Sequence, residues 1–237
     1  MLDFFNKGIF NKGKGKMSGQ KIFQIGFNKC GTKSLNRLFK NNDIKGLHFE
    51  KGELAISIKN RIDKGEDPIA DYKEYTYFTD MECTTRKDVP LIEAYKYYEY
   101  FYKWYPDALY ILNTRNVENW IKSRLAQGSG NYARCYQRHY NLQTTEHVIY
   151  RWRLDWFEHH ANVLKFFEDK PDANFLIYDI ENDDDLKIIN FLRQACKIKD
   201  DEFPHKGKTK VPKGRKRKWN TDKANSIEGQ TDKLLSA

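Results

Sequence analysis

The segment from Lys21 to Phe39, KIFQIGFNKCGTKSLNRLF, constrains the fold of this chain more than any other stretch. Its apolar start, Ile22–Ile25, is typical of a buried strand, and its apolar end has the spacing of a helix. Gly26 and Gly31 bound the turn between them. A strand, a glycine-bounded loop and a helix start form an anion site, because the first N–H groups of a helix have no intrahelical partner and its dipole is positive there.

The residues expected to bind the anion form one continuous segment soon after Gly26. Lys29 supplies a mobile cation, and Thr32 and Ser34 supply hydroxyl donors. The full predicted set is Asn28, Lys29, Cys30, Gly31, Thr32, Lys33 and Ser34. The nucleotide-binding motif GxxxxGK[ST] requires lysine directly after the second glycine, but here Thr32 stands there and Lys33 follows one residue late. The alternative is an ordinary strand-to-helix turn with surface lysines.

Composition limits the class of protein. The 237 residues include 15 Phe, 15 Tyr and 5 Trp, enough aromatic volume for the core of one α/β domain. No run of eighteen apolar residues occurs, so no transmembrane segment is expected. The lysine- and glycine-rich residues 1–20 are predicted to be a disordered leader. The four cysteines are scattered without a CxxC pair or metal-ligand spacing, which predicts reduced thiols, no metal site and a cytoplasmic protein.

The net charge of +9 belongs to one segment near the C-terminus. Residues Lys206–Lys218 (KGKTKVPKGRKRK) hold eight basic residues and no acidic ones; without them, 34 basic residues face 33 acidic ones. We therefore treat 206–237 as a separate basic segment. It raises the alternative of a nucleic-acid-binding protein, but a basic tail without interleaved aromatic residues supplies non-specific attraction only, and no specific nucleic acid is expected.

Apolar runs and helical periodicity alternate along the rest of the chain. We expect strands at 22–25, 75–79, 108–113 and 174–178. We expect helices after the first loop and at 56–64, 89–105, 117–126, about 145–168 and 184–196. Residues 45–53 and 127–140 are expected to be irregular. The alternation predicts a three-layer α/β fold over 21–205, with a mostly parallel sheet flanked by helices. Ligands of such sheets bind beyond the carboxyl ends of the strands.

The residues after the strand at 108–113 help to distinguish between the classes of phosphate-binding enzyme. The sequence YILNTRNVENWIKSRL places Arg115 after a strand and Ser123 eight positions later, slightly over two helical turns. Arg115 can then fork onto a second phosphate while Ser123 donates a hydroxyl hydrogen bond. Following a Lys-x-Gly-Thr loop, this pair resembles the sulfotransferases that use 3′-phosphoadenylyl sulfate.

The resemblance continues through NFLIYDIEND, IINFLRQAC and DEFPHKGKT, and covers about 21–210. It implies a P-loop NTPase-like architecture, a first loop that holds the 5′-phosphosulfate, and a 3′-phosphate held by Arg115 and Ser123. The PKGRKRKWN stretch resembles the loop that covers that phosphate, which adds Lys213 and Gly214 to the cofactor site. The implied reaction is in-line sulfuryl transfer from this donor, without a metal, to a hydroxyl or amine of a small-molecule or glycan acceptor.

The catalytic groups follow from the chemistry of transfer. A cation must stabilise charge on the leaving oxygen, and Lys29 is our choice for it. A base must take the acceptor proton. We prefer Asp80, with Glu82 as its neighbour; Glu50 and His48 are the alternatives.

A different enzyme class also remains open on the sequence. In a P-loop nucleotide kinase, Asp80 or Asp179 would hold magnesium. The late position of Lys33 and the pair formed by Arg115 and Ser123 argue against it. Trp120 is predicted either to touch the adenine or to pack in the core. The identity of the acceptor and the oligomeric state are not predicted.

Overall fold

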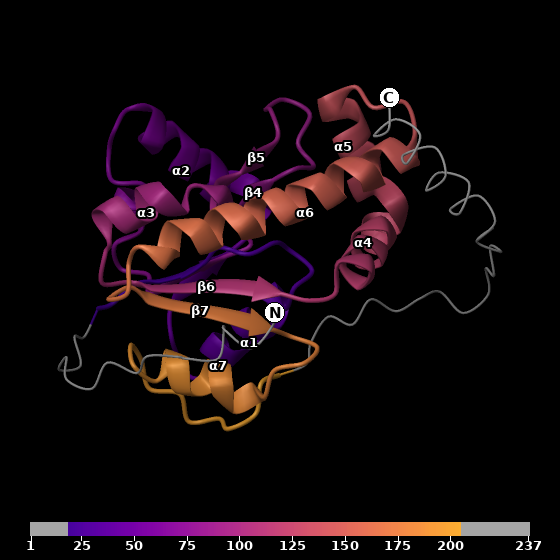
Figure 1. Cartoon of the computed structure of the whole chain (residues 1–237). Coiled ribbons are helices and arrows are strands. Elements are labelled where there is room, and N and C mark those ends of the chain that lie inside the picture. The colour runs from indigo at the N-terminus through magenta and orange to yellow at the C-terminus, as the bar shows by residue number, and fades with distance from the viewer. Residues whose placement is uncertain (1–18, 205–237) are drawn as a thin grey trace.

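The computed structural model describes residues 19–204 (Figure 1). Most of the predicted leader 1–20 and the whole basic segment 206–237, with Lys213 and Gly214, lie outside the described residues. The predicted domain boundary at 205 therefore stays a prediction.

The elements follow one another in the order that the alternating pattern predicts. The strands are β1 (Ile22–Gln24), β2 (Gly46–His48), β3 (Tyr77–Thr79), β4 (Glu82–Cys83), β5 (Ile92–Glu93), β6 (Leu109–Thr114) and β7 (Asn174–Asp179). The α-helices are α1 (Thr32–Asn41), α2 (Glu53–Asp63), α3 (Tyr98–Trp104), α4 (Val117–Ala126), α5 (Asn131–Tyr140), α6 (Thr145–Glu168) and α7 (Asp185–Leu192). Short 3-10 helices occupy Glu50–Gly52, Ala70–Tyr72, Ala94–Lys96 and Gln127–Gly130.

Within the described residues, five parallel strands form the central sheet in the order β2-β3-β1-β6-β7. Helices α1 and α7 cover one face, and α2, α3 and α6 lie over the other (Figure 1). The predicted three-layer α/β fold is confirmed. Because all five strands run the same way, their carboxyl ends meet at one edge of the sheet.

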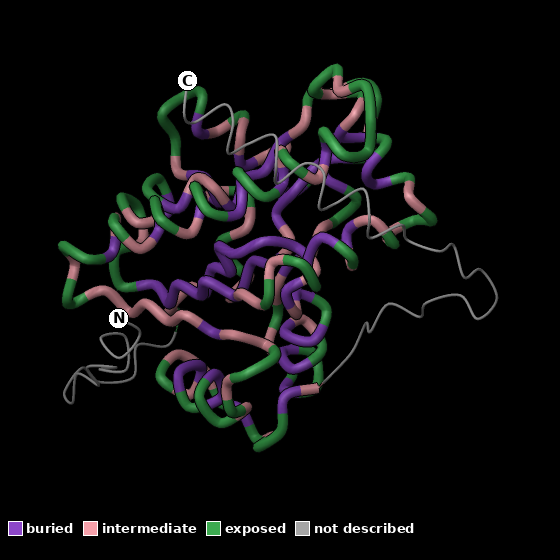
Figure 2. The backbone as a smooth tube through the Cα atoms, turned by 45° about the vertical axis from the view of Figure 1, so that its right-hand side comes forward, coloured by how far each residue is buried: buried purple, intermediate pink, exposed green. Residues whose placement is uncertain are grey.

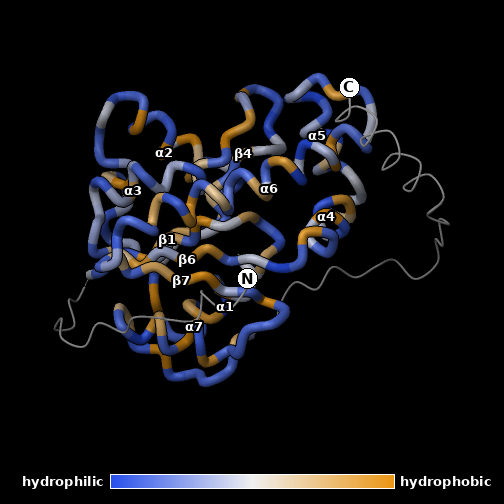
Figure 3. Tube along the Cα trace, viewed as in Figure 1, coloured by the Kyte–Doolittle hydropathy of each residue, from blue (hydrophilic) through white to orange (hydrophobic). Residues whose placement is uncertain are grey.

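The core is divided between the two faces of the sheet. In β1, Ile22 packs with α1 and α7, whereas its neighbour Phe23 packs under the opposite helices. Successive strand side chains point to opposite faces, so a strand covered on both sides is apolar throughout. The buried and apolar strands run through the middle of the molecule (Figures 2 and 3). Helices thus cover both faces of the central strands β1, β3 and β6, whereas the edge strands β2 and β7 are mostly half-buried.

Three helix starts carry the caps that their sequences suggest. The Asn116 side chain accepts the N–H groups of Glu118 and Asn119, and Thr144 accepts that of His147. Asp184 accepts the N–H of Leu186. Each cap satisfies a backbone donor that the helix itself leaves unpaired. The predicted starts of α4, α6 and α7 are confirmed, although α7 ends at Leu192 instead of reaching 196.

Three assignments made from the sequence are wrong. Residues 45–53 are not all irregular, because Gly46–His48 forms β2 along β3. Three residues are too few to display an alternating pattern. Residues 127–140 include the helix α5, whose buried Tyr132, Ala133 and Tyr136 have helical spacing behind a glycine-rich turn.

The predicted helix 89–105 is the third error. Only Tyr98–Trp104 is α-helical. Pro90 disfavours a helical conformation at the residue before it, and Ile92–Glu93 pairs with β4 instead. Buried hydrogen bonds from Tyr95 and Tyr136 hold the Glu93 carboxylate in this extended position. A tertiary contact therefore overrides the local helical preference.

Candidate active site

The carboxyl edge of the sheet brings five predicted or newly found polar residues into one row. In strand order they are His48 at the end of β2, Asp80 after β3, Lys29 after β1, Arg115 after β6 and Glu181 after β7. These residues are separated by up to 152 positions in the sequence, from Lys29 to Glu181. The parallel sheet alone makes them neighbours.

The loop after β1 is held by its backbone carbonyls. The Asn113 side-chain amide donates to Phe27 O at 3.0 Å and to Cys30 O at 2.8 Å. The Trp120 indole donates to Asn28 O at 3.0 Å, and Arg115 Nη1 donates to Lys29 O at 3.1 Å. Four consecutive carbonyls are thus turned toward β6 and α4.

This arrangement determines the direction of the loop amides. All peptide bonds in the described part of the chain are trans. Each carbonyl points opposite to the N–H of the next residue, so the amides of 28–31 are turned away from β6 and α4. Lys29 and Gly31 have φ values of 63° and 88°, and positive φ is characteristic of anion-binding backbone nests. No side chain caps α1 at Gly31.

Gly26 is required where the loop passes β6. A Cβ atom there would lie 2.3 Å from both the backbone and the side-chain oxygen of Asn113. Only glycine permits this approach, because real contacts at that distance do not occur. The first glycine of the motif therefore serves packing, whereas Gly31 serves the left-handed backbone.

Asn28 belongs to a buried network instead of presenting its side chain outward. Its Oδ1 accepts from Arg124 Nε at 2.9 Å, and its Nδ2 donates to Glu82 Oε1 at 2.8 Å. Arg124 is fully buried and lies between Glu82 and Glu93. Asn28 thus contributes its backbone to the predicted cofactor site, and its side chain fixes the loop.

The other loop residues divide by exposure. Cys30, Thr32 and Ser34 are buried, and burial raises the pKa of the Cys30 thiol far above its ordinary value. Lys33 is exposed, and Lys29 is partly exposed. Burial lowers the pKa of Lys29, the positive charge of Lys33 lowers it further, and the carboxylate of Asp80 opposes both. The two lysines and Asp80 therefore share one electrostatic environment.

Asp80 and His48 lie next to each other beyond β3 and β2. His48 Nε2 is 3.8 Å from Asp80 Oδ2, and His48 Nδ1 is 2.9 Å from the Thr79 hydroxyl. Asp80 Oδ1 is buried and has no hydrogen-bond partner, and the backbone is left-handed there, with φ 55°. Burial raises the pKa of Asp80, although Lys33 and Lys29 oppose the shift.

The remaining base candidates differ in their surroundings. Burial, together with Lys33 and Lys40, lowers the pKa of His48 to about 4, so its imidazole is neutral at pH 7. Glu50 is exposed, and its carboxylate accepts the backbone N–H of His48 at 3.4 Å. Glu82 is bound by Asn28 and Tyr132 within the buried network. At the carboxyl edge of the sheet, Asp80 and His48 are therefore half-buried, and Glu50 is exposed.

Arg115 is at the opposite side of the loop from Asp80. Its guanidinium forms hydrogen bonds to the carboxylate of Glu181 as well as to Lys29 O. Ser123 lies on α4 one turn beyond Asn119, on the face of the helix that Asn119 presents to Glu181. The predicted pair of Arg115 and Ser123 thus borders one surface beside the loop.

The sequence left the role of Trp120 open between an adenine contact and the core; its side chain is fully buried and its indole donates to Asn28 O of the loop, as expected of a core residue. Three other residues that shape this site were not predicted. Asn113 carries a signal that could have been read, because a polar residue ends an otherwise apolar strand. Arg124 and Glu181 carry no such signal, since their partners are distant in the sequence.

Comparison with known families agrees with this geometry. A model of the sulfotransferase domain matches residues 21–154, which is more than half of the chain. The chain belongs to the sulfotransferases. Its general activity is therefore that of a transferase for sulfuryl groups, and the match contains the loop, Asp80, Arg115 and Ser123. No curated protein matches the chain.

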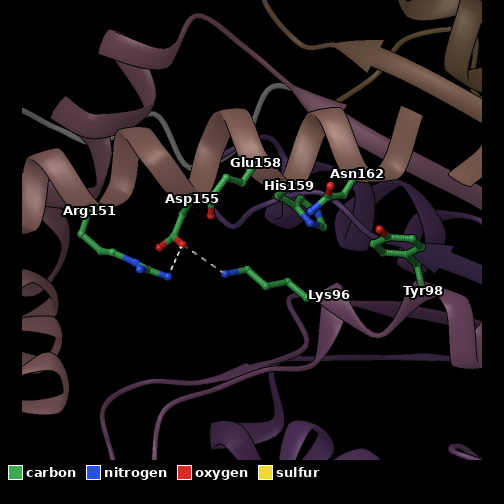
Figure 4. A pocket seen from close by; sticks show the side chains of 7 residues that line it. All are labelled: Lys96, Tyr98, Arg151, Asp155, Glu158, His159 and Asn162. Carbon is green, nitrogen blue, oxygen red and sulfur yellow. Dashed lines mark hydrogen bonds and ion pairs between the residues drawn. The ribbon is translucent and has the colours of Figure 1, made fainter. Parts of the chain in front are cut away.

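A polar hollow of about 170 Å³ lies elsewhere on the sulfotransferase, between α6 and the segment before α3 (Figure 4). Asp155 binds Arg151 and Lys96 across it. None of the site residues predicted from the sequence lines it. Among residues 19–204, no three His, Cys, Asp or Glu side chains are grouped to hold a metal ion. No helix in the described region is both long and apolar enough to cross a membrane.

Proposed function

We propose that the protein transfers the sulfuryl group of 3′-phosphoadenylyl sulfate to a hydroxyl or amine of a small-molecule or glycan acceptor. The observation that carries this proposal is the loop whose four consecutive carbonyls are bound by β6 and α4. The amides of that loop are turned away from these elements, beside the start of α1 and the Lys29 ammonium. Such a combination suits the two anionic groups of a phosphosulfate.

The residues present fit this donor on structural grounds. Gly31 leaves the helix start without a side chain, so the backbone can approach a phosphate closely. Arg115 adds a guanidinium fork on one side of the loop, where a second phosphate would reach it. Two separate anion sites distinguish a 3′,5′-bisphosphate from a nucleotide whose phosphates form one chain.

The role of each group follows from its place. When bound, the donor supplies an activated sulfuryl group and a phosphate leaving group. Lys29 stabilises the charge that develops on the leaving oxygen, and the first-turn amides of α1 add to this effect. Arg115 and Ser123 hold the 3′-phosphate, which does not change during transfer. Positioning and electrostatic stabilisation are then the main catalytic contributions.

Asp80 is the proposed base because it lies at the carboxyl edge of the sheet, beyond β3 and next to the loop. Its raised pKa makes it a better proton acceptor than an ordinary carboxylate while it remains ionised near neutral pH. His48, neutral at pH 7 and 3.8 Å away, is the runner-up and can orient the carboxylate. Glu50 remains the third candidate.

Calorimetry of the full chain with adenosine 3′,5′-bisphosphate and with ATP tests the proposal. We expect the bisphosphate to bind more tightly, and its affinity not to depend on magnesium. Tighter ATP binding that requires magnesium would favour the nucleotide kinase instead. Sulfation of a panel of hydroxylated acceptors then identifies the acceptor class.

A further inference from the structure

Glu181 places its carboxylate on the donors that the proposed function assigns to the 3′-phosphate. Arg115 Nε donates to Glu181 Oε1 at 3.1 Å, and Arg115 Nη2 binds the same oxygen. The backbone N–H of Asn116 donates to Oε2 at 3.0 Å. The Asn119 side-chain amide lies 3.2 and 3.3 Å from the two carboxylate oxygens. One carboxylate thus accepts from four donor nitrogens of three groups.

These donors suit a larger anion as well as they suit a carboxylate. They combine a guanidinium, a backbone amide at the start of α4 and a neutral side-chain amide, which is a typical set for phosphate oxygens. Hydrogen bonds from Asn116, Arg115 and Asn119 lower the pKa of Glu181 even though its burial opposes this. Glu181 is therefore an anion at neutral pH.

The surroundings place this carboxylate where a bound 3′-phosphate would meet it. Ser123 follows Asn119 by four residues and lies on the same face of α4. A group held between Arg115 and Ser123 would therefore share donors with Glu181. Two anions on one guanidinium repel each other, so the phosphate and the carboxylate compete.

We propose that Glu181 is an internal competitor that sets the affinity of the site for the 3′-phosphate. This inference rests on the proposed function. The Glu181 backbone is held by its N–H, which donates to Asp179 Oδ1 at 2.9 Å. The side chain is 25% exposed, so it can rotate toward solvent while the backbone stays in place. Nucleotides without a 3′-phosphate bind with the carboxylate still on Arg115.

If Glu181 competes with the 3′-phosphate, removing its charge should change the affinity only for nucleotides that carry a 3′-phosphate. Glu181→Gln removes the competing charge and keeps the size of the side chain. The dissociation constant for adenosine 3′,5′-bisphosphate should fall about fivefold, as for the loss of a partly exposed ion pair. The constant for AMP, which lacks the 3′-phosphate, should stay within about twofold.

The matched control is Glu118→Gln. Glu118 lies in the first turn of the same helix, but it pairs with Arg153 instead of Arg115. This variant removes the same charge from the same end of α4 and should leave both dissociation constants unchanged. Calorimetry of the full chain at one fixed, low salt concentration measures all six pairs of variant and nucleotide, and thermal melting confirms that each variant is folded.

Each result has a defined meaning. A selective gain for the bisphosphate in Glu181→Gln alone supports the competition. An equal gain for AMP, or the same gain in Glu118→Gln, shows a general charge effect and overturns it. Weaker bisphosphate binding in Glu181→Gln shows that Glu181 positions Arg115, which also overturns it. Absence of bisphosphate binding in every variant, the unaltered chain included, overturns the proposed function itself.

Discussion

Arg115 and Arg124 both bind the loop after β1, but they do so from opposite environments. Arg124 is fully buried beneath Asn28, flanked by two carboxylates and stacked against aromatic rings. Arg115 is 19% exposed at the rim and binds Lys29 O and Glu181. A buried guanidinium has no alternative partners and fixes a shape. A rim guanidinium can exchange its carboxylate for a ligand, which is the property that a binding residue needs.

Replacing the buried arginine gives the largest expected effect. Arg124→Met removes a buried counter-charge from the ionised carboxylate of Glu93 and leaves Asn28 Oδ1 without a donor. The free energy of unfolding should fall by about 3–5 kcal/mol, as when one partner of a buried ion pair is removed. Urea unfolding measures it.

The control for this variant is Arg153→Met. Arg153 forms an exposed pair with Glu118, at 45% exposure, so its loss should cost less than about 1 kcal/mol. If the free energy of unfolding fell equally in Arg124→Met and Arg153→Met, burial would not explain the structural role of Arg124.

Lys29→Ala changes a side chain of the loop that both arginines bind, and it tests a catalytic role instead of a binding or structural one. The backbone bond from Arg115 to Lys29 O remains in this variant, because only the side chain changes. We expect kcat to fall about 10²–10³-fold, as for the loss of a group that stabilises developing charge. Initial rates of bisphosphate release with a saturating acceptor measure it.

Lys40→Ala is the matched control, because Lys40 is an exposed lysine in the last turn of α1, the helix that follows the loop of Lys29. It should retain full turnover. If Lys29→Ala keeps its turnover and only binds the donor more weakly, Lys29 is an anchor and does not act on the transition state.

Arg115→Ala should have a smaller and different effect. The 3′-phosphate is bound equally in the ground state and in the transition state. Removing the Arg115 contact to it should therefore raise KM for the donor and leave kcat unchanged. The cost should be about 1.5–3 kcal/mol in bisphosphate binding, the value of a charged hydrogen bond. The urea midpoint should change little, in contrast to Arg124→Met. A large loss of stability would show that Arg115, like Arg124, has a structural role.

Among these variants, Asp80→Asn should give the smallest change in stability, and the change should be a gain. The buried Asp80 Oδ1 lacks a partner, so the charged form is costly in the folded state. Its folded pKa lies above its unfolded value, so this cost grows as the pH rises from the unfolded pKa through the folded one. Above that range the variant should be more stable by about 1 kcal/mol, and near pH 4 the difference should shrink.

The activity of Asp80→Asn should be lost at every pH, whereas that of the unaltered enzyme should fall as the pH falls through the raised pKa. Urea unfolding at a series of pH values and initial rates over the same range test the two effects together. Full activity in the variant would transfer the role of base to His48 or Glu50.

Local patterns in the sequence were sufficient to predict most helices and strands. They were insufficient to predict which distant residues these elements contact. The apolar run at Ile22 and the cap at Asn116 act over a few residues, so β1 and α4 are readable. β2 is too short to display a pattern. Glu93 takes its place in β5 through contacts with Tyr136, 43 residues away.

The same distinction applies to the site. Lys29 and Arg115 follow strands and could be named from that position alone. Arg124 looks like any helical arginine, and only its bond to Asn28 across 96 residues reveals its role. Glu181 likewise becomes notable because Arg115 lies 66 residues before it. Long-range pairing of this kind has no local signature.

The side chains that hold the loop carbonyls also have a consequence for the order of folding. They all lie between Asn113 and Trp120, 83 to 92 residues after the loop that they hold. Contacts with such large sequence separation form late, because a long segment of chain must first be brought together. During synthesis, the loop therefore acquires its anion-binding shape only after β6 and α4 have emerged. A nascent chain that ends before Asn113 holds the complete motif and still lacks the site.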